Sequence, residues 1–480
     1  MSNQFVSRRS LLSGALWLTA GGLLAACGGQ PAAPTAAPAK PAAEPTKPAA
    51  AEPTKPAAAP AATPTAAPAA KPAAGGVTKV VVWAGDLATA DESTPTGKWA
   101  KWIRTTFQEK NPKYEVDAQD KGWDQALRTG LLTAIAGNAV PDITTGEAFV
   151  HEFAALGAFN VVSDLPIKHF AYGPVAGSIY QGQLYGVPIR TSPFALETNK
   201  RTAEQAGLDP TKPPKTWDEL VANSEKAKAA GGDKFVGFNL YGPAPNRIYG
   251  TVLRTIPWIN QTGKPLGDDD GTKAFMNSPE HIPAYELSRK LFKTADPGNS
   301  FSGDEGKLYA FLWQDKAVYQ VSAIWNVYNA RDNKAETIYH PLPRKDPNVS
   351  GNVVLGNAVY SVLKKAKNLE GGVLLQKFMA EEETQRQIGI LLGNRLPTVA
   401  SVLSDPKLEQ LPAYAPVAAS IRTFADILLK EDVRPVPPYA KNPDKVWIAW
   451  GDTFGKILQS SDPIQPILDR LQADVEKLIK

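Results

Sequence analysis

The feature that most constrains this chain is a low-complexity stretch at residues 28–76. Nearly every residue in it is Ala, Pro, Thr, Lys or Glu, and the octapeptide AEPTKPAA at residues 43–50 recurs at residues 51–58. This composition offers no apolar face whose burial could offset the entropy lost on ordering. Proline-rich chain favours an extended polyproline II form of about 3.1 Å per residue, so the stretch could span on the order of 100 Å. The sequence therefore predicts a disordered stalk, with a cleaved pro-segment as the alternative, and confines folding to residues 77–480.

The residues before the stalk have the pattern of an export signal. Arg8 and Arg9 precede a mildly apolar run at residues 11–26. That run is shorter than the roughly 20 residues that a membrane-spanning helix needs. A charged start, a short apolar run and small residues at its end are typical of a signal peptide. Residues 7–12 (SRRSLL) resemble a twin-arginine signal, which is an address for export.

Cys27 ends this signal and is the only cysteine of the chain, so it cannot form an intramolecular disulfide. The preceding Leu-Ala-Ala at residues 24–26 resembles a bacterial lipobox, in which the cysteine becomes lipidated. An incidental or buried thiol is the alternative. The position favours lipidation, which predicts a protein anchored by lipid to the extracytoplasmic face of the cell membrane.

The charge balance argues against a nucleic-acid partner. Residues 1–76 hold six basic and two acidic side chains, which leaves 46 of each in residues 77–480. The net charge of +4 thus belongs wholly to the signal and stalk, and a neutral domain gives little support to nucleic-acid binding. At about 400 residues this domain exceeds one ordinary core, and we expect two lobes.

Hydrophobic patterning in the domain predicts an α/β fold. The apolar run at residues 80–83 is typical of a buried strand, and residues 114–118 alternate like a second strand. Residues 99–107 and 127–135 carry apolar side chains at helical spacing, and a third strand is expected to begin at 141–143. Strands that alternate with helices favour a mainly parallel sheet. Further helices are expected around residues 287–292, 374–379 and 464–478.

No catalytic or metal-binding constellation stands out. His151 and Glu152 begin like a zincin motif, but Ala155 occupies the position of the second histidine. The acidic run at residues 268–270 lacks the alternating ligands of a calcium loop, so a solvated turn is expected there. The sequence also lacks a nucleophile elbow, a Walker loop and a dinucleotide fingerprint. We therefore predict no enzymatic activity, no cofactor and no metal site.

The domain is instead rich in tryptophan, with ten of these residues in 77–480. Flat rings stack on the apolar faces of sugars, and aromatic residues with a few polar groups make a typical ligand site. Trp83 and Trp325 each end a strand-like run, where α/β sheets place their ligands, so we expect both to bind. Trp258 is expected in a loop, with binding and packing equally open. The tryptophans at helical spacing are expected in the core: Trp99, Trp102, Trp447 and Trp450.

Several motifs then resemble one family. Residues 183–188 (QLYGVP) with 196–200 (LETNK) look like the hinge entry of extracellular solute-binding proteins of ABC importers, specifically the carbohydrate-binding family that includes the maltose-binding protein. The resemblance continues in family order through the segments 206–210 (AGLDP), 215–220 (KTWDEL), 263–272 (GKPLGDDDGT), 278–280 (SPE), 311–318, 323–325, 356–358 (GNA), 364–368 (KKAKN) and 393–398 (GNRLPT). It covers essentially all of 77–480. Two positions depart from the family pattern, because Ala323 with Ile324 replaces a glycine before the tryptophan and Glu197 with Thr198 replaces a hinge tyrosine.

The resemblance implies two α/β lobes of the type II periplasmic-binding-protein kind, joined by crossing strands and closing on a ligand. It places one lobe at 77–192 with 342–394 and the other at 193–341 with 395–480. The implied function is capture of a carbohydrate, an oligosaccharide or a sugar derivative, by a monomer that delivers it to an ABC permease. Two alternatives stay open. One is a non-sugar ligand such as a polyamine, a peptide or a phosphorylated polyol, and the other is a secreted carbohydrate-active enzyme.

The expected ligand site gathers side chains from strand ends and loops of both lobes. Aromatic rings would stack on sugar faces, and acidic and amide side chains would bond hydroxyls. Two arginines near the hinge could contact ligand or tie the lobes together. The predicted substrate-binding residues are Trp83, Asp86, Glu147, Arg190, Asn239, Tyr241, Trp258, Trp325, Asn357 and Arg395.

Overall fold

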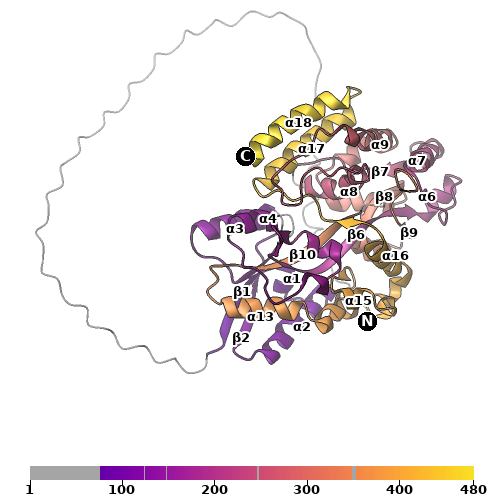
Figure 1. Cartoon of the computed structure of the whole chain (residues 1–480). Coiled ribbons are helices and arrows are strands. Elements are labelled where there is room, and N and C mark those ends of the chain that lie inside the picture. The colour runs from indigo at the N-terminus through magenta and orange to yellow at the C-terminus, as the bar shows by residue number, and fades with distance from the viewer. Residues whose placement is uncertain (1–75, 124, 147–148, 246–247, 349–352) are drawn as a thin grey trace, which may run out of the picture. The chain divides into compact units, whose positions relative to one another are not determined.

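The computed structural model describes residues 76–123, 125–146, 149–245, 248–348 and 353–480. The predicted signal peptide, Cys27, nearly all of the predicted stalk and the predicted site residue Glu147 lie outside these described residues. Figure 1 shows the described part as two groups of helices on either side of long central strands. Within the described residues, no helix combines the length and the apolar character needed to cross a membrane.

A single mixed sheet runs through this part of the chain. Its strands follow the order β2-β1-β3-β10-β6-β8-β7, with β9 and β11 paired to β6 and β12 paired to β10. The pairs β1·β2, β1·β3, β7·β8 and β10·β12 are parallel, whereas the pairs that β6 makes are antiparallel. The strands are β1 (Thr78–Trp83), β2 (Tyr114–Gln119), β3 (Ile143–Gly146), β6 (Val187–Asn199), β7 (Val236–Asn239), β8 (Ala317–Ala323), β9 (Thr337–His340), β10 (Val353–Val362), β11 (Leu396–Pro397) and β12 (Val433–Arg434), and the hairpin of β4 (Ile179–Tyr180) and β5 (Gln183–Leu184) stands apart.

Strand β6 divides the sheet into two halves. Its first part pairs with β10, from Val187 to Pro193, and its last part pairs with β8 and β9, from Phe194 to Asn199. The strands β1, β2 and β3 lie on one side of this division, which defines the β1 half. The strands β7, β8 and β9 lie on the other side, which defines the β8 half. Strands β6 and β10 are thus long elements that cross from one half toward the other, as the resemblance implied.

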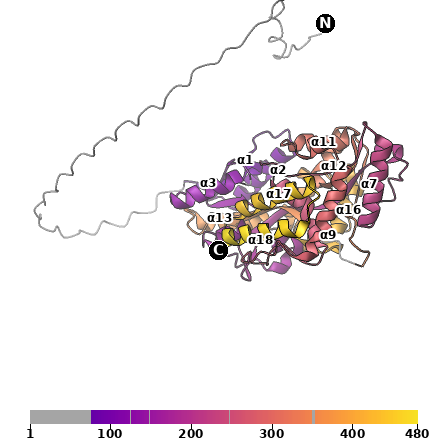
Figure 2. The same cartoon turned by 90° about the horizontal axis from the view of Figure 1, so that it is seen from above.

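Helices cover the sheet in both halves, as Figures 1 and 2 show. In the β1 half they are α1 (Gly85–Ala88), α2 (Pro95–Lys110), α3 (Gln125–Ala136), α4 (Val150–Ala155), α5 (Tyr172–Ala176), α13 (Leu369–Met379), α14 (Glu382–Gln387) and α15 (Ala400–Leu403). In the β8 half they are α6 (Lys200–Gln205), α7 (Trp217–Gly231), α8 (Ile248–Asn260), α9 (Ile282–Lys293), α10 (Pro297–Ser300), α11 (Glu305–Trp313), α12 (Ile324–Asp332), α16 (Ala418–Lys430), α17 (Pro443–Gln459) and α18 (Ile464–Ile479).

Local sequence explains why two of these helices begin where they do. Thr94 caps α2 by accepting from Gly97 N at 3.0 Å, and Pro95 fits the first helical position. Thr216 caps α7 in the same way, and the carboxylate of Glu219 reaches back to the backbone N–H of Lys215 at 2.6 Å. This reciprocal arrangement is close to a capping box, so the KTWDEL motif has a direct structural role.

Each half of the protein has its own hydrophobic packing. One core packs α7, α8, α9, α16, α17 and α18 against β6 and β8 and includes Trp258 and Trp450. A second packs α2 and α13 against β1 and β10, around Trp99. A third, smaller core joins Leu127 and Leu131 of α3 to Phe153 of α4. Because the first core is distinct from the other two, the β1 half and the β8 half can each keep their packing if their relative position changes.

The predicted α/β class is confirmed, as are the predicted strands at 80–83 and 114–118. The predicted helices at 99–107, 127–135, 287–292, 374–379 and 464–478 correspond to α2, α3, α9, α13 and α18. The loop position predicted for Trp258 is wrong, because this residue lies inside α8 immediately after Pro257. Trp325 lies in the first turn of α12, directly after β8, rather than at the end of the strand itself.

Candidate ligand-binding cleft

A pocket lies between the two halves. From the β1 half it is lined by His151 of α4, Gly177 and Val359, and from the β8 half by Tyr249 of α8 and Trp447 of α17. Asn357 of β10 and the segment 435–438 complete the wall. The cavity among these residues measures about 20 Å³, room for about one water molecule, so a larger ligand requires the halves to move apart. Aromatic rings on one side and polar groups on the other give this pocket the character of a ligand site.

His151 is the titratable group of the pocket. Burial lowers the pKa of its imidazole to about 4, against the opposing influence of the Ile179 backbone and of Asp270 and Asp269. The neutral ring is therefore the form present near pH 7. Its ring meets that of Tyr180 edge-on, with centroids 5.7 Å apart.

Asn357, a predicted site residue, is buried at the pocket wall. Its amide Nδ2 donates to the carbonyl of Pro174 at 3.0 Å. Its carbonyl oxygen Oδ1 is buried and has no hydrogen-bond partner among the described residues. A buried acceptor without a partner is costly, so a ligand hydroxyl or a water at this atom would be stabilising.

Asp86 and Arg190 lie against one another, as two of the predicted site residues. Arg190 donates from Nη2 to Asp86 Oδ2 at 2.8 Å and from Nε at 3.2 Å. The hydroxyl of Tyr360 donates to the other Asp86 oxygen at 2.9 Å. Both charged side chains are 11% exposed. The carboxylate thus has three protein donors, and Arg190 ties β6 to the start of α1 within the β1 half.

Trp325 stands where the β8 half meets the long strands. The guanidinium carbon of Arg395 lies 4.4 Å from the centre of the Trp325 ring system, a cation–π contact. Phe194 of β6 meets the same ring edge-on at 5.6 Å. A Cβ atom on Gly356 of β10 would come within 3.2 Å of the Trp325 ring, so the ring fits closely against that strand. The structure therefore brings together two predicted site residues, Trp325 and Arg395.

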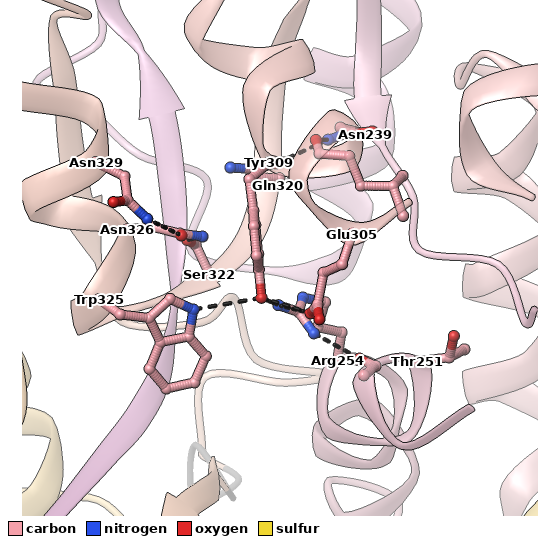
Figure 3. A network of polar contacts seen from close by, with 12 residues as sticks. Asn239, Thr251, Arg254, Glu305, Tyr309, Gln320, Ser322, Trp325, Asn326 and Asn329 are labelled. Atoms are coloured by element: carbon pink, nitrogen blue, oxygen red, sulfur yellow. Dashed lines mark hydrogen bonds and ion pairs between the residues drawn. The ribbon is translucent and has the colours of Figure 1, made fainter. Parts of the chain in front are cut away.

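A partly buried polar network contacts the Trp325 indole, as Figure 3 shows. The Trp325 indole N–H donates to the hydroxyl oxygen of Tyr309 at 3.3 Å, and Arg254 Nη2 donates to that oxygen at 2.6 Å. Tyr309 in turn donates to Glu305 at 2.5 Å. The Tyr309 hydroxyl thus accepts two hydrogen bonds and donates one. Arg254 also stacks on Tyr241, with its guanidinium carbon 3.9 Å from the ring centre.

Asn239 and Tyr241, two more predicted site residues, are buried in the β8 half. The Asn239 amide donates to the Leu308 carbonyl and to Gln320 Oε1, each at 2.7 Å, and its oxygen accepts from Asn299 at 2.9 Å. These bonds use the Asn239 side chain inside the protein. Burial raises the pKa of the Tyr241 hydroxyl well above its usual range, so it stays protonated.

The remaining predicted tryptophans lie in packed surroundings. Trp83 ends β1 as predicted, with its ring near Gly130 and with Lys121 Nζ 5.5 Å from its centre. Trp258 is buried in the core of the β8 half and meets Trp217 edge-on at 6.3 Å. Neither of these two residues is among those that line the pocket between the halves.

Three pocket residues were missed from the sequence. Trp447 and Tyr249 lie on helices, and Trp447 was assigned to the core because of its helical spacing. His151 was considered only as a failed metal motif. Trp447 and Tyr249 are about 200 residues apart in the sequence, so their spacing could not predict that both line one pocket.

Glu197 and Asp268, which lie in two of the motifs that carry the family resemblance, have structural roles. Glu197 is buried on β6 and accepts from Gln320, Tyr339 and Trp313. Burial raises the pKa of the Glu197 carboxyl even though these donors oppose the rise. Asp268 accepts from the backbone of Thr272 and Lys273, which closes the predicted acidic turn. In the described ranges no group of His, Cys, Asp and Glu side chains could hold a metal ion.

Two lobes, a crossing pair of long strands and a pocket between the lobes define a binding protein of the periplasmic type. Comparison with known families supports this class, because residues 90–386 match the bacterial extracellular solute-binding proteins. The chain belongs to this family.

Solved structures share the fold at low sequence identity. The binding protein for cyclic α-maltosyl-1,6-maltose from Arthrobacter globiformis superposes with a TM-score of 0.70 at 20% identity, over 84% of this chain and 100% of that one. A Mycobacterium tuberculosis protein in complex with glycerophosphocholine superposes with a TM-score of 0.67 at 16% identity, over 84% and 99% of the two chains. The fold is therefore that of two-lobed periplasmic binding proteins, with the β1 half and the β8 half as its lobes.

Curated relatives match over a shorter stretch. A binding protein of Brucella abortus is 30% identical over 161 residues, which is 32% of this chain and 38% of that protein. The sn-glycerol-3-phosphate-binding periplasmic protein of Yersinia pestis is 30% identical over 146 residues, which is 28% of this chain and 33% of that protein. The matched stretch thus spans about a third of the length of these relatives.

Proposed function

We propose that this protein is the substrate-binding lipoprotein of an ABC importer. It captures a carbohydrate, an oligosaccharide or a sugar derivative, between its two lobes and delivers it to the permease. It acts as a monomer with lobes at 77–192 with 342–394 and at 193–341 with 395–480, apart from the segment 398–405, which packs with the β1 half, and it releases its ligand chemically unchanged. Capture by closure gives a permease a liganded shape to recognise.

The observation that carries this proposal is the pocket between the halves. Tyr249 and Trp447 supply aromatic surface from the β8 half, and Asn357 supplies a buried acceptor without a protein partner. A sugar presents the matching chemistry, since its ring has apolar faces and hydroxyl edges. Trp325 with Arg395 offers a second aromatic surface beside the long strands.

The test is a thermal-shift screen of the full chain carrying Cys27→Ser against a panel of neutral sugars and oligosaccharides. A ligand present at 100 times its Kd adds about 2.7 kcal/mol to the unfolding free energy. Calorimetry with the best sugar should then show that Trp325→Ala weakens binding at least tenfold, about 1.4 kcal/mol. Trp102→Ala, a partly buried tryptophan that packs on Phe378 in the β1 half, is the matched control and should keep the wild-type affinity.

A phosphorylated polyol is the second candidate ligand. Its support is the Yersinia pestis relative, named for sn-glycerol-3-phosphate, together with the arginine that lies over Trp325. The same screen therefore includes glycerol 3-phosphate and glycerophosphocholine. A shift with these compounds and none with neutral sugars would replace the carbohydrate proposal. The enzyme alternative is tested by incubating the protein with oligosaccharides, and the appearance of cleavage products would refute pure binding.

The membrane attachment belongs to the same proposal. Cys27 would carry the lipid, the twin arginines would direct export, and residues 28–76 would hold the domain away from the bilayer. Cys27→Ser should move the exported protein from the membrane fraction to the soluble fraction. Membrane association that survives this substitution would refute the lipid anchor.

A further inference from the structure

Two polar contacts join the halves at the rim of the pocket. In the first, Arg128 of α3 forms two parallel bonds with Glu152 of α4, from Nε at 2.6 Å and from Nη2 at 2.5 Å. The remaining nitrogen, Nη1, lies 3.2 Å from Asp444 Oδ2, in the first turn of α17. The three side chains are 11%, 8% and 22% exposed, so this is a largely desolvated cluster.

The cluster crosses between separate hydrophobic cores. The neighbour of Arg128, Leu127, packs in the small core of the β1 half, and Glu152 lies on α4 of the same half. Asp444 lies near Val446 and Trp447, which pack in the core of the β8 half. The pair Arg128–Glu152 is therefore internal to one half, whereas Arg128–Asp444 exists only while the halves are together.

The second contact joins the same two halves. The backbone N–H of Gln181, in the turn between β4 and β5, donates to Asp270 Oδ1 at 3.0 Å. Asp270 belongs to the acidic turn that Asp268 closes, and a Cβ atom on Gly271 in this turn would meet Tyr439 of the β8 half. The acidic turn thus packs on the β8 half, and the carboxylate of Asp270 connects it to the β1 half.

Both contacts flank the pocket directly. His151, which lines the pocket, is the neighbour of Glu152, and its ring touches that of Tyr180 next to Gln181. Trp447, on the opposite wall, lies one helical turn after Asp444. Separation of the halves would break both contacts and expose the walls of the pocket to solvent.

We propose that Arg128, Glu152 and Asp444, together with Asp270 and Gln181, form a clasp that stabilises the closed arrangement of the halves, so that part of the population is closed over the pocket before ligand binds. This inference rests on the proposed function in one respect: it requires that the two halves can move apart and close again, as in ligand capture. The clasp gives the empty protein a closed state whose population depends on Asp444 and Asp270. Ligand entry then requires its opening.

The test uses the full chain without any added ligand. With Cys27→Ser, spin labels at Ala136→Cys on α3 and Lys456→Cys on α17, both exposed positions, report the distance between the halves by electron paramagnetic resonance. Asp444→Ala should raise the ratio of long to short distances at least tenfold, about 1.4 kcal/mol. Asp270→Ala should act in the same direction, and both variants together should open the protein further.

The matched control is Asp405→Ala. Asp405 pairs with Arg386 at 2.6 Å and is 24% exposed, close to the 22% of Asp444, and both partners of this pair accompany the β1 half. This variant should lose stability and keep the wild-type distances. The proposal is overturned if Asp444→Ala keeps the wild-type distances, or if the wild-type protein already shows only the long distance. Because no ligand is used, either result is independent of whether a sugar binds.

Discussion

Two largely buried arginines, Arg128 in the β1 half and Arg254 in the β8 half, are neutralised in different ways. Arg128, in the β1 half, lies between the carboxylates of Glu152 and Asp444. Arg254, in the β8 half, is 3% exposed and is surrounded by aromatic rings, with its nearest carboxylate, Glu305, 3.5 Å away. Burial alone would lower both guanidinium pKa values, but the neighbours of each arginine outweigh burial and raise them.

The difference lies in where the partners belong. One partner of Arg128 comes from the other half, so part of its stabilisation depends on how the halves are placed. All partners of Arg254 belong to the β8 half or to β6, so its stabilisation is the same whether the halves are together or apart. The buried charge of Arg128 is thus sensitive to whether the halves are closed, whereas that of Arg254 belongs to a network that positions the Trp325 ring.

The largest expected effect separates these two roles. Removing Arg128 leaves the buried carboxylate of Glu152 without its partner, so Arg128→Met should lower the free energy of unfolding in urea by about 3–5 kcal/mol. Arg254→Met should lower it by less, because the carboxylate that Arg254 leaves behind, Glu305, is 42% exposed to solvent. Only Arg128→Met should also lengthen the spin-label distance between α3 and α17 in folded protein. Equal lengthening in both variants would break the comparison, because Arg254 would then contribute to closure.

The sequence predicted the elements of the fold well where one face of a helix or strand is apolar. Helix α18 and strand β1 follow from periodicity alone, because burial of an apolar face is a local property. Trp258 shows the limit of such reasoning. The Ile-Pro-Trp order suggested a loop, but α8 continues through Pro257, although this residue has no N–H to donate to the carbonyl of Leu253.

The candidate site was less accessible to sequence reasoning. Trp447 has helical spacing because it packs in the core, and the same ring also lines the pocket, so periodicity could not separate the two uses. The contact between Arg128 and Asp444 joins residues more than 300 positions apart, and no motif marks it. Asn239 carries the polar chemistry expected of a ligand residue, yet its amide is used by neighbours that only the fold brings close.

A second, intermediate effect concerns pH. The pKa of His151 is about 4 in the closed pocket, compared with 6.5 for an exposed histidine, so states that expose His151 bind a proton more readily. Acidification from pH 7 to pH 5 should therefore favour opened or unfolded states by about 2 kcal/mol through this group. The spin-label distance between the halves should lengthen over this range and shorten again on return to pH 7.

His151→Gln is the control for this prediction, since it removes the titrating group from the pocket wall. The charged groups that face His151 are Asp269 and Asp270, and the Tyr180 hydroxyl lies nearby. The other two histidines with lowered pKa, the buried His281 and the partly buried His340, lie in the β8 half and should affect stability without affecting closure. Acid opening that is unchanged in His151→Gln would assign the pH response to another group.

The smallest expected effect tests whether the Arg254 network positions Trp325. Tyr309→Phe removes the hydroxyl that accepts from both Arg254 and the Trp325 indole, and loss of such hydrogen bonds costs about 1 kcal/mol each. The ring of residue 309 stays, so packing is preserved. In a nitrogen-15 spectrum of the indole groups, with Trp325→Phe used for assignment, the Trp325 signal should shift and its proton should exchange faster with solvent.

A matched pair in the same half controls for general loosening. Trp450 donates its indole N–H to the hydroxyl of Tyr285 at 3.0 Å, deep in the core of the β8 half. Tyr285→Phe should shift the Trp450 signal and leave that of Trp325 in place. If Tyr309→Phe leaves the Trp325 signal unchanged, the ring is held by Phe194, Gly356 and Arg395 alone. Arg254 would then stabilise the β8 half without any link to the aromatic surface beside the long strands.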